Sequence, residues 1–201
     1  MKRSVIYNNI FTYRILMNIL YLFKYKQRFI DIIELISEND KSILELCFGD
    51  IHIANTCKDR GLHWHGIDIN ESFVKYAKNK GFEATKQDLA CLNIFPTADV
   101  CIMSGSLYHF HNEIELLFLK MLKSAPKIII SEPIINLSSK KGIIGKISKK
   151  LTNAGKGNES FRFNKISIIN TLEQYKNKLN FKYRIISIKK DILIEITNER
   201  D

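Results

Sequence analysis

Apolar and polar positions divide this chain into short, continuous apolar runs and longer segments with helical spacing. The first run, at 43–48, predicts a buried parallel strand that Gly49 ends. Residues 51–60 then predict a helix, and residues 63–67 predict a second strand that ends on Asp68. Units of this kind, with a glycine turn and a terminal acid, bind nucleoside cofactors at the carboxyl ends of their strands.

The rest of the chain continues this alternation of strands and helices. Strands are expected at 82–86, 98–103, 127–130, 181–189 and 192–196, and helices at 71–80, 112–123 and 165–179. Lys190-Asp191 joins the last two strands, which predicts an antiparallel hairpin. We expect the chain to leave the sheet at Pro133, because proline cannot donate a ladder hydrogen bond. The pattern therefore predicts an α/β fold of five alternating β/α units followed by a hairpin.

The N-terminal region, 1–38, is expected to form a helical cap, with one helix at 8–29 and a second at 31–38. Its apolar residues at helical spacing are Ile10, Tyr13, Leu16, Met17, Leu20 and Phe23. Polar residues interrupt this stretch, and it is too short to span a bilayer, so no stable membrane insertion is expected. Packing on the fold and a weak amphipathic contact with a membrane surface both stay open as roles for the first helix.

The turn after the first strand has the features of a ligand-binding loop. Such a turn brings backbone close to the ligand, and Gly49 supplies a residue without a β-carbon. Asp68 lies roughly 20 residues further along the chain, where a carboxylate can accept hydrogen bonds from both hydroxyls of a ribose.

This stretch resembles the first motif of the class I S-adenosylmethionine (SAM)-dependent methyltransferases, an acid followed at alternate positions by glycines. Glu45 matches the acid and Gly49 matches the central glycine, whereas Cys47 and Ile51 replace the first and third glycines. Cysteine is small enough for the first replacement to be tolerated. Ile51 is the larger departure, because it adds bulk where the helix approaches the strand. The resemblance covers about 29–133 well and the remaining chain loosely.

The resemblance implies a Rossmann-like, seven-stranded sheet, mostly parallel with a C-terminal antiparallel hairpin, helices on both faces and a cap over the cofactor. It implies SAM as the cofactor and contact between Asp88 and the adenine amino group, although a turn-capping role for Asp88 is equally open. The expected cofactor-binding residues are Glu45, Cys47, Gly49, Asp68, Ile69, Asp88, Leu89 and Ser104. We expect no metal, since the methyl group of a sulfonium is already activated.

Three residues after the fourth and fifth predicted strands are candidates for catalysis. His109 is the best candidate for a general base, because a neutral imidazole titrates near physiological pH. Tyr108 can orient the methyl acceptor or line the methionine pocket, and packing in the core is an equal alternative. Glu132 can bind an acceptor amine or hydroxyl, or form a structural ion pair with a lysine.

The net charge of +10 fits an anionic partner, and it equally fits a lysine-rich surface that binds nothing. Glycines and lysines are concentrated in 136–162, which is expected to form a basic, lid-like insertion. Among the four cysteines no pair has zinc-ligand spacing, which favours reduced thiols in the cytoplasm.

The leading hypothesis is SAM-dependent methylation of the oxygen or nitrogen of a small molecule, with an anionic metabolite as one candidate. An Asn-Pro-Pro-Tyr motif and a Pro-Cys nucleophile are both absent, which disfavours amide-type N-methylation and cytosine C5 chemistry. The alternatives are an RNA methyltransferase, a catalytically inactive partner subunit and, less favoured, a nicotinamide-dependent enzyme. Residues 1–201 are expected to form a single domain, with the cofactor-binding core at 42–133 and the C-terminal helix and hairpin at 165–201. The acceptor and the oligomeric state stay open.

Overall fold

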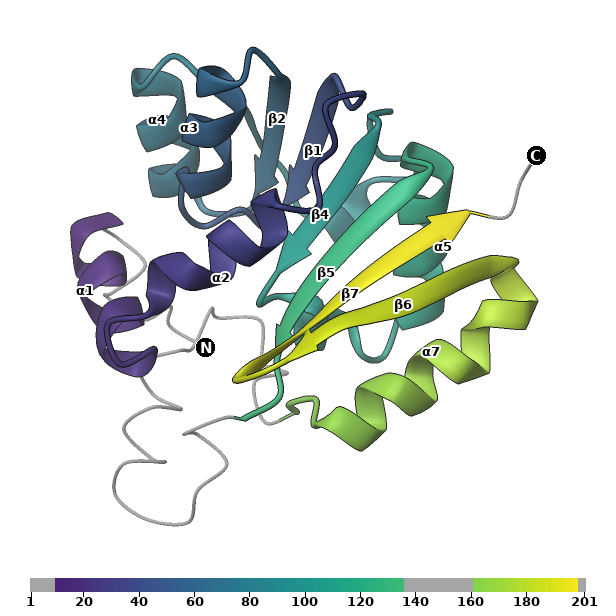
Figure 1. The fold of residues 1–201 in the computed structure, drawn as a ribbon. Helices are drawn as coiled ribbons and strands as arrows, with labels where there is room; N and C mark the ends of the chain where they lie inside the picture. Colours follow the sequence, from purple (N-terminus) through teal and green to yellow (C-terminus); the bar gives the residue numbers. More distant parts are fainter. Residues whose placement is uncertain (1–9, 136–160, 199–201) are drawn as a thin grey trace.

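A computed structural model describes residues 10–135 and 161–198 of the chain. Its centre is a seven-stranded sheet with the strand order β3-β2-β1-β4-β5-β7-β6 (Figure 1). The strands are β1 (Ser42–Leu46), β2 (His63–Asp68), β3 (Glu83–Lys86), β4 (Val100–Ser104), β5 (Lys127–Pro133), β6 (Phe181–Ile188) and β7 (Asp191–Asn198). The first five strands are parallel, and β7 runs antiparallel to both β5 and β6. The expected mostly parallel sheet with a C-terminal hairpin is therefore confirmed.

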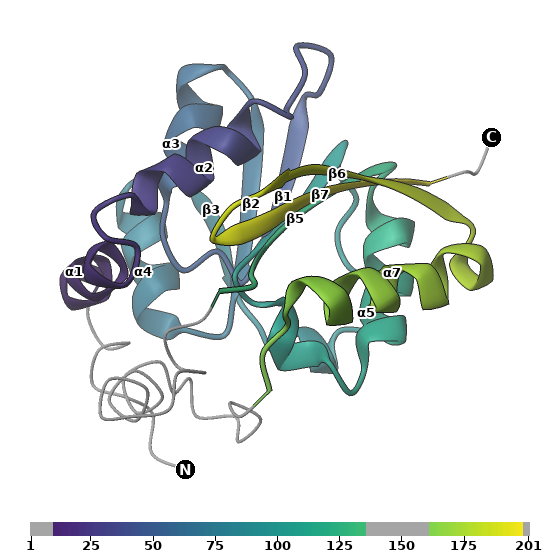
Figure 2. The ribbon, with the colours of Figure 1, turned by 60° about the horizontal axis from the view of Figure 1, so that its bottom comes forward.

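Helices cover both faces of the sheet, as Figure 2 shows. They are α1 (Ile10–Leu20), α2 (Tyr25–Ile33), α3 (His52–Asp59), α4 (Glu71–Asn79), α5 (Ile114–Ser124) and α7 (Lys165–Leu179), with short 3₁₀ helices η2 (Leu89–Cys91) and η3 (Leu107–Phe110). α5 and α7 share one apolar core with the sheet, and α1 to α4 share the other. Successive residues of each central strand enter opposite cores, because side chains alternate across a strand.

The N-terminal cap differs from the expected pair of helices at 8–29 and 31–38. Its first helix ends at Leu20, and α2 begins at Tyr25 after a bend in which Leu22 and Phe23 have φ angles of 49° and 62°. These positive φ angles end an α-helix, although the apolar spacing alone is compatible with an unbroken one. The bend lets Tyr21 and Tyr25 pack against each other, with ring centroids 5.5 Å apart. Asp31 belongs to α2, so the helix predicted at 31–38 is wrong.

The ends of the other elements are close to those expected. Asn70 caps α4 as predicted, since its side chain accepts a hydrogen bond from the Ser72 backbone N–H. The fifth strand runs on to Pro133, which pairs with Asp191 of β7 and is the last residue of β5. The chain thus leaves the sheet at the proline, as expected, but three residues later than the predicted end of the strand.

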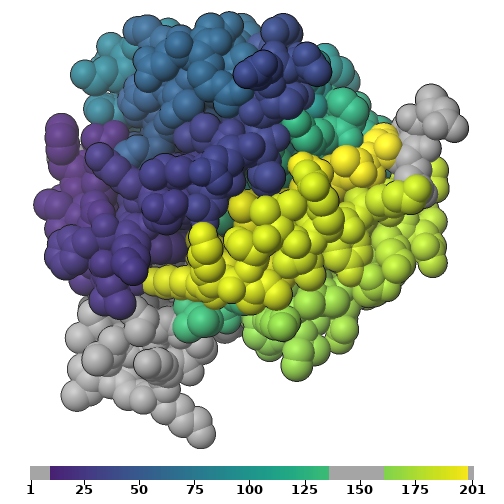
Figure 3. Space-filling model, in the orientation of Figure 1, coloured from purple at the N-terminus to yellow at the C-terminus, as the bar shows by residue number. Residues whose placement is uncertain are grey.

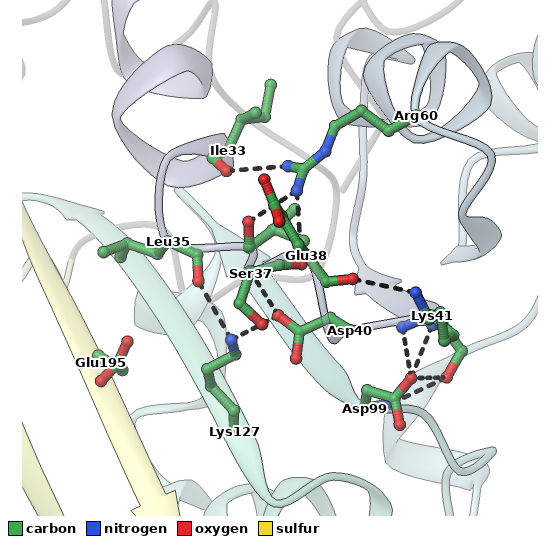
Figure 4. Close-up of polar contacts among 12 residues, drawn as sticks. Ile33, Leu35, Ser37, Glu38, Asp40, Lys41, Arg60, Asp99, Lys127 and Glu195 are labelled. Carbon is green, nitrogen blue, oxygen red and sulfur yellow. Dashed lines mark hydrogen bonds and ion pairs between the residues drawn. The ribbon is translucent and has the colours of Figure 1, made fainter.

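A dense set of polar contacts joins the connecting segments at the amino end of the sheet (Figure 4). One carboxylate oxygen of Asp99 accepts hydrogen bonds from the backbone N–H groups of Lys41 and Ser42 and from the Ser42 hydroxyl, at 2.7–2.9 Å. Lys127 donates to Asp40 and to the carbonyl of Leu35. These contacts fix the entry points of β1, β4 and β5.

Candidate functional site

The glycine turn after β1 is built from two residues in the left-handed region of backbone conformation. Cys47 has a φ of 55° and Gly49 has a φ of 60°. The Cys47 N–H donates to the carbonyl of Ile67 at 2.7 Å, which holds the turn against β2. A β-carbon on Gly49 would lie 3.0 Å from the Tyr13 hydroxyl of α1. The central glycine is therefore required both by its φ angle and by the helix above it.

The two replacements in the glycine motif have different structural outcomes. Cys47 adopts a positive φ angle that ordinarily favours glycine, so its backbone is strained. Ile51 is buried in the core that the sheet shares with α1 to α4, and α3 begins at the next residue. The side chain of Ile51 thus contributes to packing.

Asp68, the last residue of β2, lies directly beside this turn. Its Oδ2 accepts a hydrogen bond from the Gly49 N–H at 3.0 Å, and its Oδ1 accepts one from the Asn70 N–H at 2.7 Å. Only 6% of the residue is exposed. These two backbone hydrogen bonds hold the carboxylate against the glycine turn.

Glu45 does not reach the glycine turn through any described contact. It is fully buried, and its Oε2 accepts a hydrogen bond from the Trp64 indole N–H at 2.8 Å, while its Oε1 has no partner among the described residues. Burial raises the pKa of this carboxyl well above its ordinary value, and the Trp64 hydrogen bond only partly offsets the rise. The described role of Glu45 is to join β1 and β2 beneath the turn.

The next predicted cofactor residues lie at the ends of β2 and β3. Asp88 caps η2, since its side chain accepts from the Ala90 N–H at 3.1 Å. Leu89 is buried, whereas Ile69 is 40% exposed. The Gln87 N–H donates to the carbonyl of Asp68 and so joins the two strand ends. These residues follow neighbouring parallel strands and lie at the same edge of the sheet.

Two buried polar atoms at the ends of β4 and β5 have no hydrogen-bond partner among the described residues. They are the Ser104 hydroxyl and the Glu132 Oε1. The other oxygen of Glu132 accepts from the Leu107 N–H at 3.0 Å and so holds the start of η3. Burial raises the pKa of Glu132 to about 8, although Arg28 and backbone hydrogen bonds oppose this shift.

Tyr108 and His109 lie side by side on η3, with ring centroids 3.9 Å apart. Tyr108 is buried and His109 is partly exposed. The Arg162 guanidinium lies 3.8 Å from the centroid of the Tyr108 ring, and Phe161 stacks on His111 at 4.2 Å. The chain that follows residue 160 is thus packed on η3. Residues 136–160 of the predicted basic insertion lie outside the described residues, as does the N-terminal part of the cap, 1–9.

Arg28 is a buried charged residue near the site that the sequence did not predict. Arg28 is buried on α2, ion-pairs with Asp191 of β7 at 3.0 Å and donates to the carbonyl of Ser131 at 3.1 Å. The backbone at Gly105 approaches it so closely that a β-carbon there would lie 2.5 Å from a guanidinium nitrogen. The available signal was spacing: Arg28 falls between Tyr25 and Ile32 on the apolar face of its helix.

Arg14 and Asp50 form a second contact between the cap and the site that the sequence did not predict. The Arg14 guanidinium donates two hydrogen bonds to the Asp50 carboxylate, at 2.7 and 2.9 Å. Burial raises the pKa of Asp50, but hydrogen bonds from His52 and Arg14 outweigh it and hold that pKa below its ordinary value. Asp50 directly follows Gly49, so α1 is attached to the glycine turn itself.

Solved structures with this fold are SAM-dependent methyltransferases, at low sequence identity. The methyltransferase domain of a bacterial Hen1 superposes with a TM-score of 0.61 and 14% identity, covering 86% of this chain and 97% of that one. Magnesium protoporphyrin IX methyltransferase from Synechocystis, with bound S-adenosylhomocysteine, has a TM-score of 0.61 and 16% identity over 87% of this chain and 84% of that one. An Escherichia coli rRNA methylase has a TM-score of 0.56 and 14% identity over 90% and 65% of the two chains.

The chain therefore has the fold of the class I SAM-dependent methyltransferases, as its glycine turn and its C-terminal hairpin indicate. No protein-family model matches the sequence, and no curated protein matches it. In the described part of the chain, no three His, Cys, Asp or Glu side chains are grouped as a metal site would require. Within the same residues, every helix is too short or too polar to cross a bilayer.

Proposed function

We propose that this protein transfers a methyl group from SAM to an oxygen or nitrogen atom of a small molecule. The observation that carries the proposal is the contact between Asp68 and the glycine turn, at 3.0 Å, in a fold of this class. It brings together the two features that a nucleoside cofactor requires, a close approach to backbone and a ribose-binding acid. The sequence predicted both residues, and they meet at the carboxyl end of the sheet.

The residues present fit a bound SAM molecule. Gly49 lacks a β-carbon at the turn, and the Asp68 carboxylate lies beside it, where it would accept hydrogen bonds from the ribose hydroxyls. Ile69 is exposed enough to contact the adenine, next to Asp88 and Leu89. Cys47 directly follows β1 and Ser104 ends β4, where the methionine portion would bind, and Glu45 would support the turn from below. SAM would supply a methyl group on a positively charged sulfur, ready for in-line displacement.

His109 is the residue that we propose takes a proton from the acceptor. It is partly exposed on η3, whereas Glu132 is fully buried beneath the same helix. Glu132 would therefore act mainly as a positioning residue, because it holds the Leu107 N–H at the start of η3. Tyr108, between Arg162 and His109, would orient the acceptor.

Titration calorimetry with SAM and S-adenosylhomocysteine tests the proposal. Wild-type protein should bind both ligands, and Asp68→Ala should lose this binding. Asp99→Ala, with its carboxylate at the other end of the sheet, is the matched control and should bind as wild type does. A folded wild-type protein that binds neither ligand would contradict the proposal and favour a catalytically inactive partner subunit.

The acceptor is tested once binding is established, by following S-adenosylhomocysteine release over a panel of small molecules that includes anionic metabolites. His109→Ala should lower the turnover rate at least about a hundredfold without changing SAM affinity.

RNA is the second candidate acceptor, supported by the net charge of +10 and by the fold shared with an rRNA methylase. Transfer of labelled methyl groups to bulk RNA, with no transfer to small molecules, would favour it. A cytoplasmic location fits the four cysteines, which form no disulfide in the described part of the chain.

A further inference from the structure

The outer face of the N-terminal cap carries a row of exposed, large apolar side chains. Phe11, Ile15 and Ile19 recur every four residues along α1 and are 63%, 61% and 55% exposed. In the bend that follows, Leu22 and Phe23 are 76% and 82% exposed. We call these five residues the cap row. Four-residue spacing places the three helical members on one face of α1.

The exposed cap row and the packed residues of α1 lie on different sides of the helix. The opposite side of α1 carries Tyr13, whose ring lies 5.0 Å from that of Phe73, and Arg14, which binds Asp50. α1 lies at the edge of the molecule in Figures 1 and 3. The inner face thus attaches the helix to the fold, while Ile15 and Ile19 on the outer face stay exposed.

The surroundings of the cap row are basic. Residues 10–30 contain no Asp or Glu, and their basic residues are Arg14, Lys24, Lys26 and Arg28, of which Arg14 and Arg28 are ion-paired with Asp50 and Asp191. Lys24 and Lys26 are exposed and follow Phe23 directly. The first acid of the chain, Asp31, accepts a hydrogen bond from Lys189, so its charge is balanced. An exposed apolar row beside the two exposed lysines complements a lipid bilayer, which has an apolar interior and an anionic surface.

We propose that the cap row docks on the surface of an anionic lipid bilayer. The apolar side chains would enter the boundary between headgroups and acyl chains, and Lys24 and Lys26 would face the lipid phosphates. A second copy of this chain is a poorer partner, because it would bring the same acid-free segment against itself in a protein of net charge +10. This inference concerns the outer face of α1 and does not depend on methyl transfer.

Co-sedimentation of the full chain with vesicles tests the proposal. Wild-type protein should bind vesicles that contain phosphatidylglycerol, should bind pure phosphatidylcholine vesicles much less, and should be released by high salt. Ile15→Ser/Phe23→Ser should weaken binding to the anionic vesicles at least about tenfold, because two large apolar side chains no longer enter the interface. Lys24→Glu/Lys26→Glu should weaken it as well.

The matched control is Ile94→Ser/Ile166→Ser, which removes two side chains of similar exposure, 73% and 71%, outside the cap. It should bind the anionic vesicles as wild type does. Circular dichroism and thermal melting confirm that each variant is folded. The proposal is overturned if wild-type protein does not bind anionic vesicles. It is also overturned if Ile15→Ser/Phe23→Ser and Ile94→Ser/Ile166→Ser bind these vesicles equally well. It is also overturned if sedimentation shows a dimer that Ile15→Ser/Phe23→Ser dissociates while vesicle binding is absent.

Discussion

The two ends of the central sheet differ in whether their polar side chains have hydrogen-bond partners. At the amino end, a single oxygen of Asp99 accepts three hydrogen bonds, and Lys127 is shared between Asp40 and the Leu35 carbonyl (Figure 4). At the carboxyl end, the Ser104 hydroxyl and the Glu132 Oε1 are buried without a partner among the described residues.

The difference supports the proposal that the carboxyl end binds a ligand, whereas the contacts at the amino end stabilise the fold. A buried polar atom without a hydrogen bond costs about 1–3 kcal/mol. Natural proteins keep such costs where the atom serves a ligand or a reaction. The left-handed backbone at Cys47 adds a further cost at the same end. The following predictions test this contrast.

The largest expected effect is on cofactor affinity. Asp68→Ala should weaken SAM binding about a hundredfold or more, because it removes an acceptor for two ribose hydroxyls. Titration calorimetry measures the loss. Equal affinity in the variant and wild type would mean that Asp68 only supports the Gly49 turn.

Glu132→Gln should change how stability depends on pH. The folded pKa of Glu132 is about 8, above its ordinary value of 4.5. The folded state therefore keeps a proton that the unfolded state has lost, so wild-type stability falls as pH rises from about 4.5 to about 8. The amide does not titrate, so the variant should gain up to about 4 kcal/mol relative to wild type across this range. Urea unfolding at pH 5 and pH 9 measures the difference, and a constant gap between the two proteins would refute the raised pKa.

Asp99→Ala should lower stability without affecting SAM. Its carboxylate binds two backbone N–H groups and a hydroxyl, and these hydrogen bonds hold its pKa below the ordinary value. Part of the interaction is screened by solvent, so the expected loss is about 1–2 kcal/mol near neutral pH. The loss should shrink as pH falls through the folded pKa, because wild type then loses the same contacts. Urea unfolding gives the stability, and weakened SAM binding in this variant would erase the contrast between the two ends.

The smallest expected effect is on the cap. Arg14→Lys keeps the positive charge but loses the fork that donates twice to Asp50, which should cost about 1 kcal/mol locally. Hydrogen exchange should accelerate in 10–20 and stay unchanged in the central strands. Unchanged exchange in α1 would show that Tyr13 packing alone holds the helix.

The sequence determined the class of fold and the main points of the site. Short apolar runs, Gly49 and Asp68 were enough to place the glycine turn beside the acid that we propose binds the ribose, because parallel strands end at one edge of a sheet. The C-terminal hairpin could also be predicted from the sequence, since its two strands are joined by a short turn. These features depend on local pattern and on topology rules that hold across proteins.

Only the tertiary structure decided which charged groups are buried. Arg28 pairs with Asp191, and Arg14 pairs with Asp50, across long stretches of chain, and no local pattern specifies such partners. The sequence pattern did not predict the bend at Leu22 and Phe23 either, because the apolar spacing fits a straight helix as well as two short ones. Hydrophobic periodicity records which side of an element is buried, whereas partners and bends follow from how separate elements pack together.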